Sequence, residues 1–348
     1  DLPRIDFTDG TGSLLLEPQR TNFTPYSEDF SQWTAVNGVV VTDNFTTSPD
    51  GTQNAAKFVY DGTSLGRVEF STTAGGIKTQ SVYLKTASGT QAVSIGALGS
   101  DLTEVTVTSE WQRFTHTGSG NFPRILCNDA ATIYAWGAQL EQGDYPTSYI
   151  PTNGSTVTRS ADVANNSGNA DLFNDSEGVL YAQVSGFVNG SGGDRTISIS
   201  DGSTQNALQL LLHNTANRIN FRLRSGGSLD VNISDFTFEQ NEINKIACKY
   251  KSGDYALWIN GEEKATSTSS SLPSGLSELA FDDGAFNDFY GNTKELAVFK
   301  EALTDEELAK ITSVTQQEVF YEMRDRMLQI DADYYEFGDY TTRLKKLF

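Results

Sequence analysis

The feature that most constrains this chain is a period-two pattern of apolar and polar residues, which recurs in short segments up to about residue 299. Residues 80–86 (QSVYLKT) and 218–224 (RINFRLR) are typical; in the latter Ile219, Phe221 and Leu223 share one face. Such segments predict antiparallel strands with one face in a core. Because no amphipathic helices separate them, we predict an all-β chain of two antiparallel β-sandwich (jelly-roll) domains with a short helical C-terminal segment.

The domain boundaries are predicted from length and composition. A chain of 348 residues suggests two domains at roughly 150 residues each. Residues 152–177 are rich in Asn, Ser, Gly and Asp and have no apolar periodicity, which indicates a linker. The predicted order is a lead-in segment (1–22), a first sandwich (23–151), the linker (152–177), a second sandwich (178–312) and a C-terminal assembly segment (313–348).

Two helices are predicted near the C-terminus. Thr304 and Glu307 have the spacing of a capping box, flanked by Leu303 and Leu308 as a hydrophobic staple, so a helix should run to about residue 311. A second helix over about 315–330 would carry an apolar stripe. We predict that the stripe drives self-association, with a trimer favoured; the alternative is that it packs back on the second sandwich. Its residues are Phe320, Met323, Met327 and Ile330.

Charge and cysteine content exclude several classes of protein. The chain has 25 basic and 45 acidic residues and a formal net charge of −20, which argues against nucleic acid and membrane surfaces as partners. No apolar window is long enough for a membrane-spanning helix, so no membrane insertion is predicted. Cys127 and Cys248 fall in different predicted domains and are expected to be free thiols.

The sequence contains no recognisable catalytic or metal-binding pattern. His116 and His213 are the only histidines, and each is expected to be a hydrogen-bonded strand residue. The nearest acidic pair in a β segment, Asp282–Asp283, is adjacent in sequence and so fits a loop or a cation contact better than a pair of catalytic carboxylates. We therefore predict a non-enzymatic protein that needs no cofactor and has no metal site.

Binding through a surface is the remaining class of function. A site for sugars combines an exposed aromatic ring, which contacts C–H groups, with polar side chains for the hydroxyls. The four tryptophans are the candidates, and of these Trp33, Trp136 and Trp258 are the predicted glycan-binding residues. Trp111, the fourth candidate, follows a turn at the start of a strand. For each tryptophan the alternative is a place in a core.

Several stretches resemble a module of phage tail-fibre and other virion proteins: 14–22 (LLLEPQRTN), 26–33 (YSEDFSQW), 136–151 (WGAQLEQGDYPTSYIP) and 157–163 (VTRSADV). The block between them is similar to jelly-roll carbohydrate-binding modules through residues 81–86 (SVYLKT), 109–118 (SEWQRFTHTG) and 132–141 (TIYAWGAQLE). That resemblance implies a structural calcium held by an aspartate of the last strand, but Ala135 stands at that position. The resemblance therefore leaves a structural calcium open, but the residue at this position does not support one.

The second block resembles the concanavalin-A-like, laminin-G-like sandwiches through residues 246–250, 255–261 (YALWING) and 292–308. Such domains bind glycans or proteins, or serve only as structure, so this resemblance implies the fold more than a ligand. The two resemblances together cover about residues 12–312.

These observations predict a non-enzymatic phage virion protein. It would be a tail fibre or another host-contact appendage that presents glycan-binding sandwiches, with a host cell-surface glycan and other virion proteins as partners. One alternative is a purely structural virion spacer or decoration. Another is a secreted bacterial glycan-binding adhesin, which would be extracellular.

Overall fold

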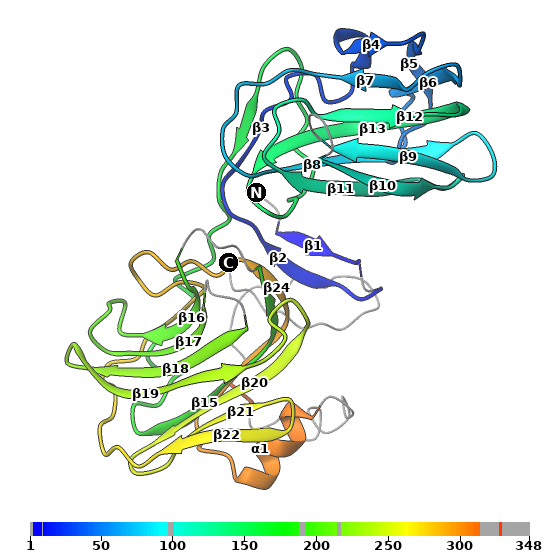
Figure 1. The fold of residues 1–348 in the computed structure, drawn as a ribbon. Helices are drawn as coiled ribbons and strands as arrows, with labels where there is room; N and C mark the ends of the chain where they lie inside the picture. The colour runs from blue at the N-terminus through cyan, green and yellow to red at the C-terminus, as the bar shows by residue number, and fades with distance from the viewer. Residues whose placement is uncertain are drawn as a thin grey trace. The chain divides into compact units, whose positions relative to one another are not determined.

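The computed structural model describes residues 3–8, 10–96, 101–187, 193–213, 217–313 and 327–328. Within them the chain is nearly all β, with one α-helix and one short 3-10 helix, η1 (Phe30–Gln32) (Figure 1). Each pair of neighbouring strands in these sheets is antiparallel. The predicted fold class is confirmed.

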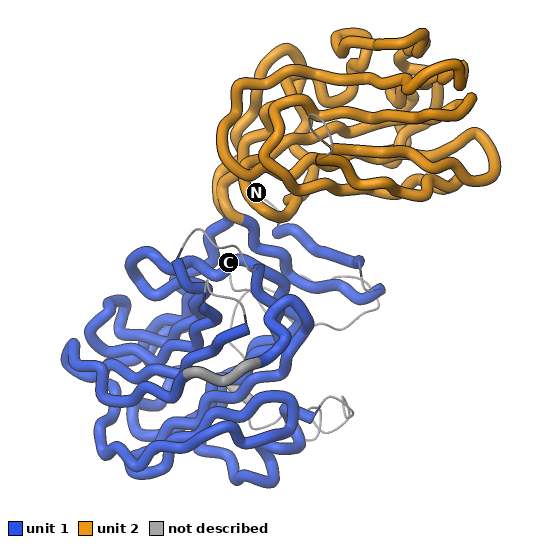
Figure 2. Tube along the Cα trace, in the orientation of Figure 1, with its two compact units in different colours: residues 1–17, 162–348 blue, residues 18–161 orange. Residues whose placement is uncertain are grey.

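The chain forms two compact units (Figure 2). Unit 2 is the continuous stretch 18–161, whereas unit 1 combines Asp1–Glu17 with Asp162–Phe348. The chain thus begins in unit 1, builds all of unit 2 and returns to unit 1. Unit 2 is an insertion near the start of unit 1 and not the first of two consecutive domains.

Unit 2 contains two five-stranded sheets. One has the order β10 (Leu102–Val107), β9 (Gln91–Gly96), β12 (Arg124–Cys127), β7 (Gly66–Glu69), β4 (Thr34–Val36). The other, called the broad sheet below, has the order β11 (Gln112–Gly118), β8 (Lys78–Thr86), β13 (Ala130–Gln142), β6 (Ala55–Asp61), β5 (Val40–Thr46). A separate pair, β3 (Arg20–Asn22) and β14 (Val157–Arg159), joins the two ends of unit 2.

The core of unit 2 takes alternate residues from the strands, as the period-two pattern predicts. Phe58 and Tyr60 of β6, Val82 and Leu84 of β8, and Ile133 of β13 are all buried in one apolar cluster. The residues between them in sequence lie on the opposite face of the broad sheet. That outer face carries the candidate site described below.

Unit 1 is also built from two sheets. The larger has eight strands, in the order β1 (Arg4–Asp6), β2 (Ser13–Leu16), β24 (Gly291–Phe299), β15 (Glu177–Gly186), β20 (Asn244–Lys251), β21 (Tyr255–Ile259), β22 (Glu262–Ser267), with β25 (Met327–Leu328) also on β24. The second has the order β19 (Ser228–Thr237), β18 (Arg218–Ser225), β17 (Ala207–Leu212), β16 (Arg195–Ser200), β23 (Glu278–Ala280).

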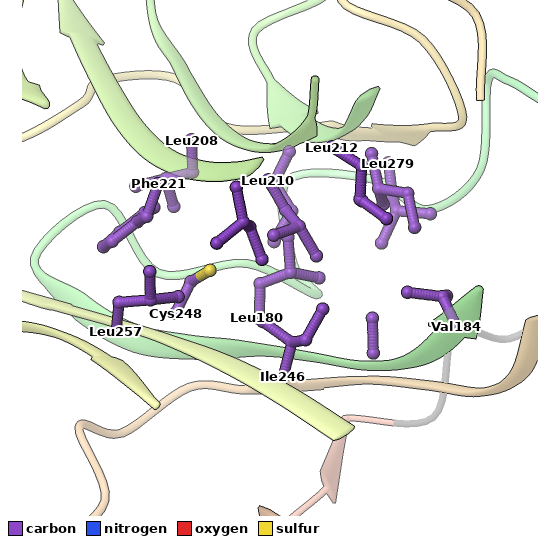
Figure 3. Close-up of a cluster of buried hydrophobic side chains, with 14 of the residues drawn as sticks. Leu180, Val184, Leu208, Leu210, Leu212, Phe221, Ile246, Cys248, Leu257 and Leu279 are labelled. Carbon is purple, nitrogen blue, oxygen red and sulfur yellow. The ribbon is translucent and has the colours of Figure 1, made fainter. Parts of the chain in front are cut away.

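The two sheets of unit 1 enclose one apolar cluster. Figure 3 shows Leu180 and Ile246 of the larger sheet opposite Leu210 and Phe221 of the smaller one. Cys248 lies in the same cluster, and both cysteines are free and buried, as predicted. Burial raises the pKa of the Cys248 thiol well above its ordinary value, so this side chain behaves as a small apolar residue.

The predicted lead-in segment 1–22 and linker 152–177 need correction. Strand β2 pairs with β24, and Leu14 and Leu16 are buried in the unit 1 cluster. Within the expected linker, Ala164 and Phe173 join the same cluster, while β14 pairs with β3 in unit 2. These segments were misassigned because hydrogen bonds to distant strands order them, and such pairing leaves no periodic pattern in the local sequence.

The first predicted helix is confirmed as α1 (Asp305–Thr312). The Thr304 hydroxyl accepts from the Glu307 amide, and the Glu307 carboxylate accepts from the Thr304 amide, which completes the capping box. Leu303 and Leu308 are both buried. α1 lies against β20 and β21 on the larger sheet of unit 1.

The second predicted helix is wrong at Met327. Met327 and Leu328 form β25, which pairs with Phe299 and Val298 of β24. A strand at this point interrupts the predicted helical stripe, and the pairing agrees with the alternative that this segment returns to the second sandwich. The other predicted stripe residues, Phe320, Met323 and Ile330, lie outside the described residues. No helix in the described part of the chain is long and apolar enough to cross a membrane.

Candidate functional site

The three tryptophans predicted to bind glycan are buried, so this prediction is wrong. Trp33, Trp136 and Trp258 are only 5%, 6% and 7% exposed. Trp33 packs on Phe30 with 5.1 Å between ring centroids, and its indole N–H donates to the Tyr26 carbonyl at 2.9 Å. Burial of such large apolar rings stabilises the units, which is the alternative that the sequence left open.

The surroundings of the other two tryptophans explain their burial. Trp136 lies between Tyr83 and Tyr149, with ring centroids 5.4 Å and 4.7 Å away. Trp258 belongs to the apolar cluster that α1 covers on the larger sheet of unit 1. Neither ring is available as a platform for a sugar.

Trp111 is the tryptophan that stays partly exposed. It immediately precedes β11, an edge strand of the broad sheet. Its indole N–H donates to the carbonyl of Thr47 at 3.1 Å, and Thr47 follows β5 at the opposite edge of the same sheet. Trp111 therefore links the two edges of the broad sheet over its outer face.

Strand register places a row of side chains across this outer face. Tyr134 of β13 is directly opposite Lys85 of β8 on one side and Lys57 of β6 on the other. Lys57 is in turn opposite Thr42 of β5. Because directly opposite residues project from the same face of a sheet, four neighbouring strands contribute one continuous row.

Aromatic rings and lysine amines alternate along this row. The Lys57 Nζ lies 3.7 Å from the centroid of the Phe45 ring, which stacks on Tyr134 at 5.9 Å with an interplanar angle of 12°. The Lys85 Nζ lies 5.0 Å from the Trp111 ring centroid and 5.6 Å from that of Tyr134. These are cation–π distances. We call Phe45, Lys57, Lys85, Trp111 and Tyr134 the aromatic–lysine surface.

Apolar side chains beside the row are open to solvent. Phe45 is 43% exposed, and Val40 and Val59, which are opposite each other on β5 and β6, are 58% and 36% exposed. Val59 is two residues from Lys57 and therefore on the same face. An exposed apolar group next to ordered cations is the kind of surface that takes part in binding.

The two lysines of the surface have no carboxylate partner. Among the described residues, no Asp or Glu lies within ion-pair distance of Lys57 or Lys85. Unit 2 contains only one other lysine, Lys78, whose amine donates to the carbonyls of Ala74 and Gly76 at 2.8 Å and 2.9 Å. The free cationic amines of unit 2 are thus gathered on this surface.

The next row of the broad sheet is structural. Arg113, Tyr83 and Trp136 are opposite one another across β11, β8 and β13. The Arg113 guanidinium donates to the Ser81 hydroxyl and the Thr147 carbonyl, both at 2.8 Å. Because the Arg113 Nη2 is used within the protein and Trp136 is buried, this row supports the surface rather than extending it.

The stretches that resemble the virion module meet where the chain enters and leaves unit 2. Asn22 is fully buried and ties the first of them, 14–22, to the stretch 136–151. Its Oδ1 accepts from the amides of Thr24 and Leu140 at 3.0 Å and 3.1 Å, and its Nδ2 donates to the Ile150 carbonyl at 2.9 Å and the Ala138 carbonyl at 3.3 Å.

Further buried hydrogen bonds complete this junction. The Thr152 hydroxyl donates to the Thr24 carbonyl at 2.6 Å and accepts from the Ser27 amide at 3.0 Å. The Glu141 carboxylate accepts from the Thr147 amide at 2.9 Å. In this chain the polar residues of the motif therefore hold the two ends of unit 2 together, and they are not part of the aromatic–lysine surface.

The two histidines are hydrogen-bonded, as predicted. His116 of β11 is buried, with its Nδ1 3.0 Å from the Thr103 hydroxyl. His213, next to β17, has Nδ1 3.3 Å from an Asp194 carboxylate oxygen and Nε2 2.9 Å from the Asn220 amide group. Both side chains are used in contacts within the protein.

The described residues contain no group of three or more His, Cys, Asp or Glu side chains placed to hold a metal ion. Ala135, which stands where the resemblance implies a calcium-binding aspartate, is fully buried in the apolar core of unit 2. Asp282 and Asp283 lie in a loop, as predicted, where the Asp283 Oδ1 accepts from the amides of Ala285, Phe286 and Asn287.

Comparison with known sequences supports the fold of unit 1. Residues 187–309 match the concanavalin A-like lectin/glucanases superfamily, which agrees with the resemblance found for the second block. A search of curated proteins gave no match.

Several solved structures are similar at low identity. The CBM40 module of the Ruminococcus gnavus IT-sialidase, bound to α2,3-sialyllactose, is 18% identical, with a TM-score of 0.36 over 43% of this chain and 93% of that chain. A heptameric SAP-like pentraxin from Limulus polyphemus is 16% identical, with a TM-score of 0.34 over 40% and 71%. The enzymatically active domain of tailspike protein 2 from bacteriophage CBA120 is 14% identical, with a TM-score of 0.33 over 46% and 29%. Scores this low do not establish a common function.

Sequence reasoning missed four members of the aromatic–lysine surface and named only Trp111. The signal was present in the outward positions of the strands: Lys57 alternates with the core residue Phe58, and Lys85 with Leu84. The alternation does not specify the register between these strands. Only that register brings the five side chains of the aromatic–lysine surface together.

Proposed function

We propose that the chain is a glycan-binding protein and that the aromatic–lysine surface is where the glycan binds. The observation that carries this proposal is one ordered row of rings and amines, bordered by exposed apolar side chains. Sugars present apolar C–H faces and a rim of polar groups, and this surface offers a partner for both. The superfamily match of residues 187–309 adds a lectin-like fold in unit 1.

The test is glycan binding by two matched variants. Phe45 and Leu65 are almost equally exposed, at 43% and 42%, but only Phe45 belongs to the surface. Phe45→Ala should weaken binding to any glycan that the full chain retains on an array by about tenfold, while Leu65→Ala should leave it unchanged. Equal binding by all three proteins would place the site elsewhere.

We further propose that the chain binds glycans without cleaving them. The Glu28 carboxylate, which accepts from the hydroxyl of the Tyr149 that packs on Trp136 and from the Asn54 amide, both at 2.9 Å, is engaged in contacts within the protein. Incubation with bacterial and algal polysaccharides should release no reducing ends. Release that a single Asp or Glu substitution abolishes would contradict this proposal.

We also propose that the protein is a host-contact appendage of a phage particle, such as a tail fibre, with a host cell-surface glycan and other virion proteins as partners. The resemblance of the four junction stretches to the virion module supports this proposal. Immunogold labelling of purified particles should place the protein on a tail or surface appendage. Labelling without glycan binding would favour a structural spacer, and secretion by a bacterium would favour an adhesin.

We also propose that residues 313–348 drive self-association, with a trimer favoured; the pairing of β25 with β24 supports the alternative, in which this segment packs on the second sandwich. Light scattering should give a trimeric mass for the full chain and a monomeric mass after truncation at Ser313. An unchanged mass for both proteins would contradict assembly through this segment.

A further inference from the structure

We infer that the glycan bound by the aromatic–lysine surface is acidic, that is, it carries carboxylate or sulfate groups that pair with Lys57 and Lys85. This inference rests on the proposed glycan-binding function and adds the chemical class of the ligand. Three observations support it: the two lysines have no carboxylate partner among the described residues, aromatic rings contact their amines, and the strands set the distance between them.

The local charge is opposite to that of the protein as a whole. The chain has a net charge of −20, and unit 2 has twelve acidic and eight basic residues. Lysines in an acidic protein readily find carboxylates: in unit 1 the Lys249 amine lies 2.8 Å from Asp254 and 3.1 Å from Asp305. Lys57 and Lys85 have no such partner among the described residues.

The rings hold the two amines in defined places. Lys57 lies against Phe45, and Lys85 lies against both Trp111 and Tyr134. A lysine free in solvent loses considerable rotamer entropy when it binds an anion. Contact with the rings removes part of that freedom beforehand, so an arriving anionic group meets cations that are already positioned.

The row also sets the spacing of the ligand's charges. Lys85 is on β8 and Lys57 on β6, with Tyr134 of β13 between them. Two strand spacings separate the attachment points by roughly 10 Å. A single small anion cannot span both, whereas an oligosaccharide with repeated acidic residues can, with its C–H groups over Phe45, Val40 and Val59.

Rings interleaved with amines also occur in surfaces for single-stranded nucleic acid. The occupied ring faces favour the glycan, because Phe45 stacks on Tyr134 and the amines of Lys57 and Lys85 lie over the rings of Phe45 and Trp111, which leaves less ring surface for stacked bases. Single-stranded DNA is therefore one arm of the test.

The experiment measures binding of the full chain to two matched pairs of polymers by isothermal titration calorimetry: polygalacturonate with its methyl ester, and chondroitin sulfate with its desulfated and carboxyl-reduced form, which is neutral. The acidic member of at least one pair should bind at least tenfold more tightly than its partner. Binding should weaken as salt is raised from 50 to 500 mM, concentrations chosen because screening acts strongly over this range.

Variants then assign the effect to the two lysines. Lys57→Met and Lys85→Met keep the length of the side chain but remove its charge, and each should abolish most of the preference for the acidic polymer. Lys57→Arg and Lys85→Arg keep the charge and should retain it. Lys300→Met, which removes an exposed lysine from unit 1, is the charge control and should have no effect. Melting temperatures verify that each variant folds.

The outcomes separate this inference from the proposed function. If acidic and neutral polymers bind equally and Phe45→Ala weakens both, the surface binds glycan but the acidic class is wrong. If no polymer of either pair binds while Phe45→Ala weakens binding to a neutral glycan retained on the array, the inference fails and the proposed function stands; if the array also retains no glycan, the proposed function fails as well. If single-stranded DNA binds more tightly than every polymer and the Lys→Met variants abolish that binding, the ligand is a nucleic acid and the inference is overturned.

Discussion

At the scale of single residues, side chains of the same type have different roles in this protein because different groups surround them. Lys57 and Lys85 contact rings and face solvent, whereas Lys78 is bound by backbone carbonyls. Asn22 uses both ends of its amide in the buried junction of unit 2. For these residues, the arrangement of donors and acceptors decides what a substitution does.

The junction makes Asn22 sensitive to an isosteric change. Asn22→Asp keeps the shape of the side chain, but replaces a donor with an oxygen that faces the carbonyls of Ala138 and Ile150. We expect a loss of about 2–4 kcal/mol in the free energy of unfolding, because two buried acceptors lose their donor and a carboxylate is buried. Urea unfolding at pH 7 measures this loss. Asn37→Asp, at an exposed position, is the control and should change stability by less than about 0.5 kcal/mol.

Asp50 gives a prediction for pH dependence. The Ser48 hydroxyl and the Thr52 amide, at 2.6 Å and 2.7 Å, lower the pKa of Asp50 to about 2. An unfolded chain has an aspartate pKa of about 3.9, so the folded state favours the charged form, and Asp50 contributes stability above about pH 4 that is lost as the pH falls toward 2. An NMR titration of the carboxyl carbons should show Asp50 titrating near pH 2. A midpoint near 4 would contradict these contacts.

At the scale of elements, the short strand β2 belongs to unit 1, although most strands of that unit come after unit 2 in the sequence. β2 pairs with the edge of β24 and places Leu14 and Leu16 in the core of unit 1. It thereby covers part of an edge that would otherwise expose unpaired backbone groups. The N-terminal segment is therefore a structural part of unit 1.

Substitution of Leu16 tests this assignment. Leu16 is buried, so Leu16→Ala should destabilise unit 1 by about 2–4 kcal/mol through lost apolar burial and a cavity, with no effect on unit 2. Phe7→Ala, in the same segment but exposed, is the control. Hydrogen exchange should become faster in β15 and β20 and stay unchanged in β8 and β13. Faster exchange in β8 and β13 instead would assign the N-terminal segment to unit 2.

At the scale of the whole molecule, the chain is one sandwich with a second sandwich inserted into it. The two crossing points are tied within unit 1: the Asp162 amide donates to the Glu17 carbonyl at 2.9 Å, and the Glu17 amide donates to Asp162 Oδ2 at 2.8 Å. Arg4 forms ion pairs with both carboxylates. The ends of unit 2 are likewise joined by β3 and β14. In each unit, the two chain segments that meet at the crossing points are therefore joined by hydrogen bonds within that unit.

This arrangement predicts which fragments fold. Residues 18–161 alone, and residues 1–17 joined to 162–313 by a short Gly-Ser linker, should each unfold cooperatively near the temperature seen for that unit in the full chain. Residues 178–312 lack β2, Ala164 and Phe173 and should melt at a clearly lower temperature or aggregate. Calorimetry measures the transitions, and a fragment 178–312 as stable as the joined one would contradict the insertion.

The sequence by itself determined what depends on neighbouring residues. The alternation around Ile219, Phe221 and Leu223 specifies a half-buried strand, and Thr304 with Glu307 specifies the start of α1, because strand faces and helix caps are set within a few residues. The all-β class follows from many such segments together.

Only the tertiary structure decided what depends on pairing between distant segments. Strand register placed Lys57, Tyr134 and Lys85 in one row, and the pairing of β2 with β24 moved the N-terminus into unit 1. The burial of Trp33, Trp136 and Trp258 also depended on which sheet or helix covers each ring. Hydrogen bonds and packing between strands that are far apart in sequence select these arrangements, and no local pattern of residues encodes their partners.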